Sequence, residues 1–157
     1  MFLQNLRAKV GARLSGEKSE AGFTLIELLV VMLILGILAA IAIPAFFNQR
    51  EKATDAQAKA AARTAETSIE TYATENGGSY VGATSAILHT IEPTLVEETK
   101  GNNEIKVSGL AAKTFKVESV SATGVGFNIE RQAAGTVKFD CTNHGKSGCP
   151  SSGEWNK

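Results

Sequence analysis

The sequence predicts an α+β fold in which a long N-terminal α-helix, apolar in its first half, packs by its second half on a small antiparallel β-sheet. Three features predict this fold. Residues 28–47 form an uncharged apolar run, residues 49–76 are rich in the helix formers Ala, Glu, Lys and Arg, and four later segments are rich in Val, Ile, Phe and Thr. We therefore expect an N-terminal segment at 1–22, an apolar helix at 23–48 and a globular domain at 49–157.

The apolar run has the length of a membrane span. It contains twenty residues without a charge, which at helical rise cover about 30 Å, the thickness of a bilayer core. The preceding 22 residues hold four basic and two acidic side chains, a net charge of +2. Because basic flanks stay in the cytoplasm, we expect the N-terminus inside and the bulk of the chain outside.

Two plainer interpretations of this segment stay open. One is a secretory signal peptide cut at the small-residue site Ala40-Ile41-Ala42, and the other is a single-pass anchor that keeps its N-terminus. Three features count against the signal peptide: the run is long, a charge interrupts its start, and the helical pattern continues past Ala42.

That interrupting charge is Glu27. Burying it unpaired in a membrane costs about 2–3 kcal/mol. The nearest preceding cations, Lys18 and Arg13, lie more than two helical turns away. A cut between Gly22 and Phe23 would instead create an α-amino group at the same membrane level. The alternative is an interfacial carboxylate with no partner.

The stretch "GFTLIELLVVMLILGILAAIAIP", residues 22–44, resembles the N-terminal segment of type IV prepilins and the related pseudopilins. In that family a membrane peptidase cuts after the glycine and methylates the new N-terminus. The resemblance implies that 1–22 is a removed leader, that Phe23 becomes the methylated terminus, and that Glu27 pairs with the Phe23 amine of a neighbouring subunit. A subunit docked out of step would leave two buried charges unpaired, so the pair would set the register of a polymer.

Gly36 and Pro44 bracket a second feature of the apolar helix. Proline cannot bond the carbonyl of Ala40, and glycine weakens a helix by about 1 kcal/mol relative to alanine. The resemblance implies that the stretch between them can lose its helical hydrogen bonds in a filament. A simple kink in an intact helix is the alternative.

The second half of the helix carries an apolar stripe that should cover the sheet. Gly77-Gly78 should end the helix. The stripe consists of Ala58, Ala62, Ala65, Ile69, Tyr72 and Ala73. We expect the charged residues Lys59, Arg63, Glu66 and Glu70 to form a solvated face opposite it.

The rest of the chain is expected to form a connection at 77–103 and a sheet at 104–141. The connection should hold a short helix near Thr84–Ile91. The apolar residues of one strand do not alternate cleanly, so we expect a bulge there. The strands are expected at 104–107, 115–121, 126–131 and 136–141.

Cys141 and Cys149 are expected to form a disulfide, because two close cysteines in an exported domain usually do. Pilin-family domains also often close a C-terminal loop in this way. Zinc bound by the two cysteines and His144 is the alternative, although no fourth ligand is evident. Trp155 should pack back onto the edge of the sheet.

No catalytic or phosphate-binding motif is present, and we expect neither an enzyme, a cofactor nor a metal site. Asp55 and Asp140 read as isolated acids. The formal net charge of zero gives no support for DNA binding, which stays possible.

Taken with the resemblance, these features predict a structural subunit of a type IV pilus that serves adhesion, motility or DNA uptake. A pseudopilin of a type II secretion or competence system is the first alternative, and a membrane-tethered binding domain that never polymerises is the second. The implied partners are other copies of the chain, the prepilin peptidase and methyltransferase, the inner-membrane assembly platform and minor pilins. The precursor should sit in the cytoplasmic membrane, and the product in an extracellular or periplasmic filament.

Overall fold

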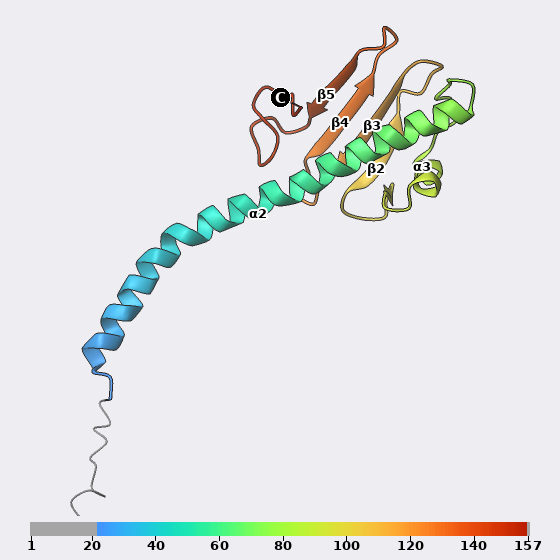
Figure 1. Ribbon diagram of the computed structural model, residues 1–157. Coiled ribbons are helices and arrows are strands. Elements are labelled where there is room, and N and C mark those ends of the chain that lie inside the picture. Colours follow the sequence, from blue (N-terminus) through green and yellow to red (C-terminus); the bar gives the residue numbers. More distant parts are fainter. Residues whose placement is uncertain (1–21, 157) are drawn as a thin grey trace, which may run out of the picture. The chain divides into compact units, whose positions relative to one another are not determined.

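The computed structural model describes residues 22–156, which divide into two compact units between Ile41 and Ala42. The expected leader at 1–22 therefore lies outside the described residues, apart from Gly22. One helix, α2 (Leu25–Glu75), belongs to both units. Figure 1 shows it together with the sheet of the second unit.

The second unit has the predicted α+β architecture. Four strand pairings follow the chain order β1-β2-β3-β4-β5; the β1–β2 pair is parallel and the other three are antiparallel. The expected short helix is present, and its N-cap Thr84 accepts a hydrogen bond from the backbone of Ile87. The elements after α2 are α3 (Ser85–Ile91), β1 (Val96–Glu97), β2 (Glu104–Ser108), β3 (Phe115–Val120), β4 (Gly126–Arg131) and β5 (Val137–Cys141).

Two details of the sheet differ from the prediction. The two-residue strand β1 lies in the expected connection and is too short to show a period. The expected bulge is wrong, because β3 pairs with β4 without a break from Phe115 to Val120. Ser119, which is fully buried, takes the inward position that the apolar pattern lacks. A small hydroxyl thus replaces an apolar side chain in a regular strand.

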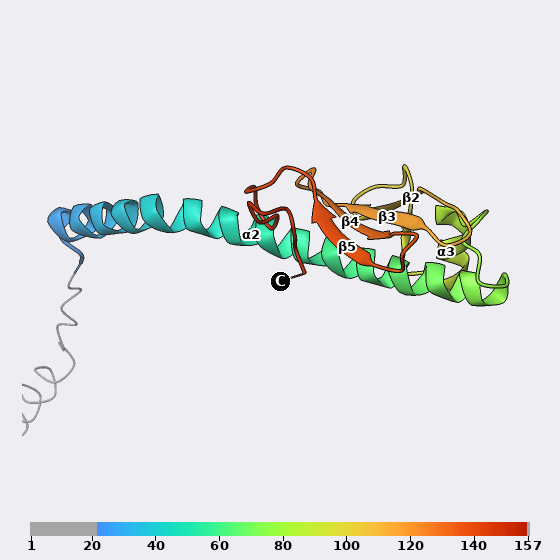
Figure 2. The same cartoon turned by 90° about the horizontal axis from the view of Figure 1, so that it is seen from above.

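The core of the second unit lies between α2 and one face of the sheet, as Figure 2 shows. The helix contributes mostly alanines, whose small side chains let a helix lie close to a sheet. Its buried apolar residues are Ala58, Ala62, Ala65, Ile69 and Ala73, and those of the three central strands include Ile105, Phe115, Val117, Phe127 and Ile129. The helix ends where Gly77 adopts a φ of 65° and the Gly78 amide bonds the Ala73 carbonyl at 2.7 Å.

The charged residues do not form the solvated face that was predicted opposite the stripe: Arg63 is exposed, but Lys59, Glu66 and Glu70 are half-buried. The Lys59 ammonium lies 5.1 Å from the ring centroid of Phe127, and the Arg63 guanidinium lies 5.2 Å from that of Trp155. Glu70 accepts an ion-pair hydrogen bond of 2.8 Å from Arg131. Positions 59, 63 and 70 each follow a stripe residue directly, so these side chains flank the stripe and reach the sheet.

Trp155 packs at the edge of the sheet, as predicted. It is buried, and its indole Nε1 donates to the carbonyl oxygens of Asp140 at 2.8 Å and Asn128 at 3.2 Å. Its ring meets those of Phe127 and Phe139 edge-on, at centroid distances of 5.9 Å and 5.2 Å. The C-terminal segment is thereby fixed to β4 and β5.

Two substitutions at Trp155 separate the contribution of the indole hydrogen bonds from that of the buried aromatic ring. Trp155→Phe keeps an aromatic ring and loses the indole donor, so it should lower the free energy of unfolding by about 1 kcal/mol. Trp155→Ala also removes the buried ring and should cost about 3–5 kcal/mol. Urea unfolding of the detergent-solubilised chain measures both. Equal midpoints for Trp155→Phe and wild type would show that the indole hydrogen bonds do not stabilise the fold.

Candidate functional site

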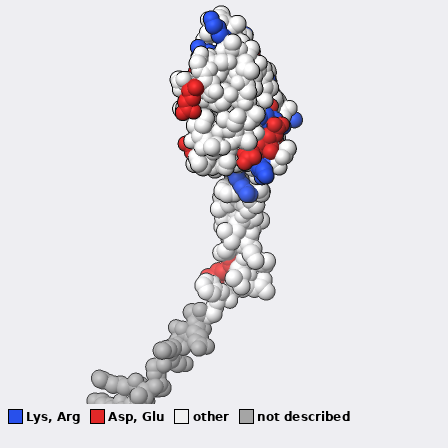
Figure 3. Space-filling view, turned by 90° about the vertical axis from the view of Figure 1, so that its right-hand side faces the viewer, with Lys and Arg blue, Asp and Glu red and all other residues white. Residues whose placement is uncertain are grey.

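The candidate site is the start of α2, where every described side chain up to Ile41 is exposed. The large apolar residues there include Phe23, which is 82% exposed, and Met32, which is 70% exposed. The helix is long and apolar enough to cross a membrane, a test that signal sequences near an N-terminus also pass. Figure 3 shows that the charged side chains gather on the second unit. The first part of α2 shows a single group of acidic atoms.

Thr24 and Glu27 form a capping box at the first turn of this helix. The Thr24 amide and hydroxyl both donate to Glu27 Oε2 at 2.8 Å, and the Glu27 amide donates to the Thr24 hydroxyl at 3.3 Å. These bonds satisfy donors that a helix start leaves unpaired, and a carboxylate is favoured at the positive end of the helix dipole. Sequence reasoning missed this role, although the motif Thr-x-x-Glu before an apolar run signals it.

The cap uses only one of the two carboxylate oxygens. Among the described residues, both donors to Glu27 belong to Thr24 and both reach Oε2. The Phe23 backbone nitrogen is not one of them. A single chain therefore does not bring the predicted Phe23 and Glu27 groups together, and the bonds from the described residues to the exposed Glu27 carboxylate all reach Oε2.

The peptide bond between Gly22 and Phe23 lies before the helix, and both residues are exposed. A Cβ built on Gly22 would meet no atom within 4 Å. No residue from 23 to 156 therefore makes glycine sterically necessary at this position. Any requirement for it would come from a molecule that acts on this bond.

Gly36 and Pro44 both lie inside α2, which continues through them without a break. Proline has no amide to donate to the carbonyl one turn earlier, so one helical bond is missing at this point. Nothing within 4 Å of Gly36 would obstruct a side chain.

Cys141 and Cys149 are joined by a disulfide in this structure, and both are buried. Because the two sulfurs share a bond, neither is available to zinc as a thiolate. His144 lies in the enclosed loop, with its Nε2 3.5 Å from a carboxylate oxygen of Asp140. The described residues contain no cluster of three metal-binding side chains.

Asp55 is not an isolated acid, which corrects the prediction. It is fully buried, and its Oδ1 accepts hydrogen bonds from the hydroxyls of Ser121 at 2.6 Å and Thr123 at 2.5 Å. Its Oδ2 accepts one from the Gly148 amide at 2.8 Å. Burial raises the pKa of this carboxyl, but the hydrogen bonds outweigh burial and the pKa is lowered overall. Asp55 lies three residues before Ala58, in line with the apolar stripe, and this spacing could have predicted its burial from the sequence.

One known family model matches the start of the chain. Residues 18–43 match the model described as the prokaryotic N-terminal methylation motif. The match includes Gly22, Phe23, Thr24 and Glu27, and its first four residues lie outside the described part of the chain. No solved structure matches the chain.

The lowered pKa of Asp55 predicts a pH dependence of stability. A carboxyl whose folded pKa lies below its ordinary value of 3.8 stabilises the fold above that value, and the stabilisation is lost as the pH falls through the folded pKa. Asp55→Asn should therefore cost about 1–2 kcal/mol near neutral pH, and the gap to wild type should narrow in acid. Urea unfolding at about pH 7 and about pH 2.5 tests this. A gap that stays constant would contradict the prediction.

Proposed function

The chain carries the class III N-terminal signal of type IV pilins and pseudopilins, and on this basis we propose that it is the structural subunit of a type IV pilus. The signal implies processing by a prepilin peptidase and assembly into a pilus-like polymer. The observation that carries the proposal is the exposed apolar first part of α2, residues 25–41, whose one acid, Glu27, lies within this signal. The precursor would be anchored in the cytoplasmic membrane by that helix.

In the proposed first step, the peptidase removes residues 1–22 and methylates the new amino group of Phe23. The exposure of the Gly22–Phe23 bond ahead of the helix supports this step, because a peptidase needs an accessible, non-helical backbone. Within the part of the chain that the structure describes, glycine at this position has no steric cause, which fits selection by the enzyme. Methylation leaves the amine positively charged.

In the proposed second step, the apolar helix leaves the bilayer and packs among the helices of other copies. Glu27 then pairs with the Phe23 amine of a neighbour. Its Oε1 would accept that bond, while Oε2 keeps the capping contact with Thr24. An unpaired charge in an apolar bundle costs several kcal/mol, so only the aligned arrangement is stable.

The helix between Gly36 and Pro44 is the proposed flexible part of the filament. It already lacks the hydrogen bond that Pro44 cannot make, so fewer bonds must break for it to extend. Other implied partners are the inner-membrane assembly platform and minor pilins. A shorter pseudopilin assembly for secretion or competence is the alternative polymer.

The mass of the mature protein tests the processing step. We expect a chain that begins at Phe23, is one methyl group heavier than its bare sequence, and is two hydrogens lighter because of the Cys141–Cys149 bond. Intact-mass spectrometry before and after reduction gives both values. A purified protein that retains Met1, or one cut after Ala42, would contradict the proposed processing.

A single substitution tests the charge pair. Glu27→Gln keeps a capping side chain, because Gln also serves at this position of a capping box, but it removes the charge. We expect normal leader removal and lost or disordered filaments, seen by electron microscopy of sheared material. Glu51→Gln, which changes an exposed acid on the same helix, should assemble normally.

The same experiment separates the alternatives. Normal filaments with Glu27→Gln would exclude the charge pair, and unchanged function without any filament would favour a tethered binding domain. Long filaments from the wild type favour a pilus. Their absence, together with a secretion or transformation defect in a deletion strain, favours a pseudopilin.

A further inference from the structure

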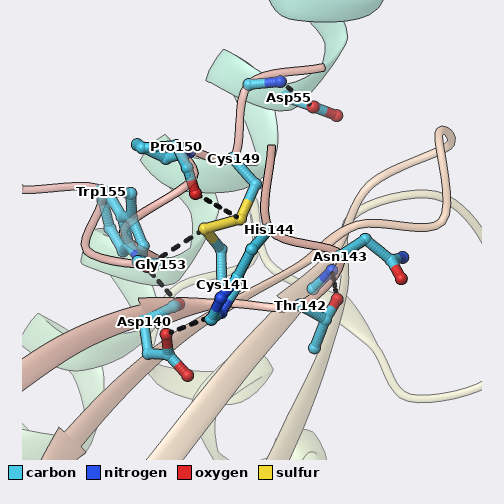
Figure 4. The surroundings of a disulfide bond; sticks show 12 residues. Asp55, Asp140, Cys141, Thr142, Asn143, His144, Cys149, Pro150, Gly153 and Trp155 are labelled. Atoms are coloured by element: carbon cyan, nitrogen blue, oxygen red, sulfur yellow. Dashed lines mark hydrogen bonds and ion pairs between the residues drawn. A yellow bond between two sulfur atoms is a disulfide. The ribbon is translucent and has the colours of Figure 1, made fainter. Parts of the chain in front are cut away.

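The buried Asp55 connects three segments that are far apart in the sequence. It lies on α2, its Oδ1 is bonded to the turn between β3 and β4, and its Oδ2 is bonded to the loop that the disulfide encloses. Figure 4 shows Asp55 facing this loop beside the disulfide. One carboxylate therefore joins helix, sheet and loop.

Gly148, the residue before Cys149, makes the contact from the loop side. Its amide donates to Asp55, and its carbonyl accepts a 2.7 Å hydrogen bond from the Lys59 ammonium, one helical turn further along α2. Both backbone polar groups of this residue are thus used by the helix. A Cβ on Gly148 would lie 2.7 Å from the Cβ of Asp55, so the loop backbone rests directly against α2.

The disulfide holds this backbone in place. The bond joins residues eight positions apart, and within the loop the Gly145 amide bonds the Cys149 carbonyl and the Cys149 amide bonds the Lys146 carbonyl. If the loop moved away, Oδ2 of Asp55 would lose the Gly148 donor. Leaving a buried carboxylate short of donors is costly, far more so than leaving a neutral group.

We propose that the Cys141–Cys149 disulfide and Asp55 form a redox-linked latch, in which closing the disulfide docks the Gly148 backbone on α2 and thereby locks the helix onto the sheet. In the closing step the two thiols lose two protons and two electrons as the S–S bond forms, and a disulfide-bearing oxidant accepts them and becomes two thiols. Reduction reverses this step and releases the loop from Asp55.

The coupling is reciprocal. If the closed loop stabilises the docked helix, then the docked helix must favour the closed disulfide to the same extent. The second unit would therefore reach its full stability only after it enters an oxidising compartment. The latch involves this unit alone and does not depend on polymerisation.

The equilibrium of the disulfide with glutathione tests the latch in the full chain in detergent. Thiol trapping gives the equilibrium constant for wild type, Asp55→Ala and the control Glu51→Ala, in native buffer and in guanidinium chloride. We expect Asp55→Ala to lower the native constant about tenfold or more, because a charged hydrogen bond to the loop is lost. The constant in guanidinium should not change, and Glu51→Ala should match wild type in both. A native constant for Asp55→Ala equal to that of wild type would overturn the proposal.

A measurement on the wild type covers the case in which Asp55→Ala does not fold. Hydrogen exchange of the oxidised chain is compared with that of the chain reduced by dithiothreitol. The latch predicts faster exchange after reduction in the loop and also in the turn at 121–125, which contains the other Asp55 partners and lies outside the disulfide loop. Faster exchange confined to the loop would overturn the proposal.

Discussion

The rest of the structure depends on the need to remove a bare apolar helix from water. From Phe23 to Ile41 the large apolar side chains are about half exposed or more, and none packs into a core of its own unit. Removing apolar surface from water is worth about 25 cal/mol per Å², so burying a segment of this size, in a bilayer or among similar helices, would be strongly favourable. The second unit consequently needs a core that forms without help from this segment.

That core is stabilised by specific polar and cation–π contacts as well as by the burial of apolar surface. The helix stripe is mostly alanine, which buries little surface per residue. Charged side chains along the stripe and at its borders add further contacts. Asp55 accepts hydrogen bonds from the turn and the loop, Lys59 and Arg63 lie over aromatic rings, and Glu70 forms an ion pair with Arg131. Most of these contacts connect α2 to residues more than sixty positions away.

Because these contacts join residues that are distant in the sequence, only part of the fold could be predicted from the sequence. Residue composition, turn residues and the spacing of apolar positions were sufficient to predict the long helix, α3 and four strands. They could not predict β1, which has only two residues, or the inward Ser119, whose position follows from its neighbours in the sheet. The partners of Asp55 have no local signature, because the turn and the loop approach it only in the folded chain. The proposed assembly role of Glu27 involves a second molecule, which the geometry of one chain does not contain.

The capping box at the start of α2 has a consequence for the proposed removal of residues 1–22. Its donors, the amide and hydroxyl of Thr24, lie on the mature side of the Gly22–Phe23 bond. Hydrolysis of that bond would leave every group of the cap in place, so the first turn of the helix need not be rebuilt. The new terminus would lie next to a helix end that is already capped. Cleavage would therefore add a positive charge without changing the conformation of the first turn.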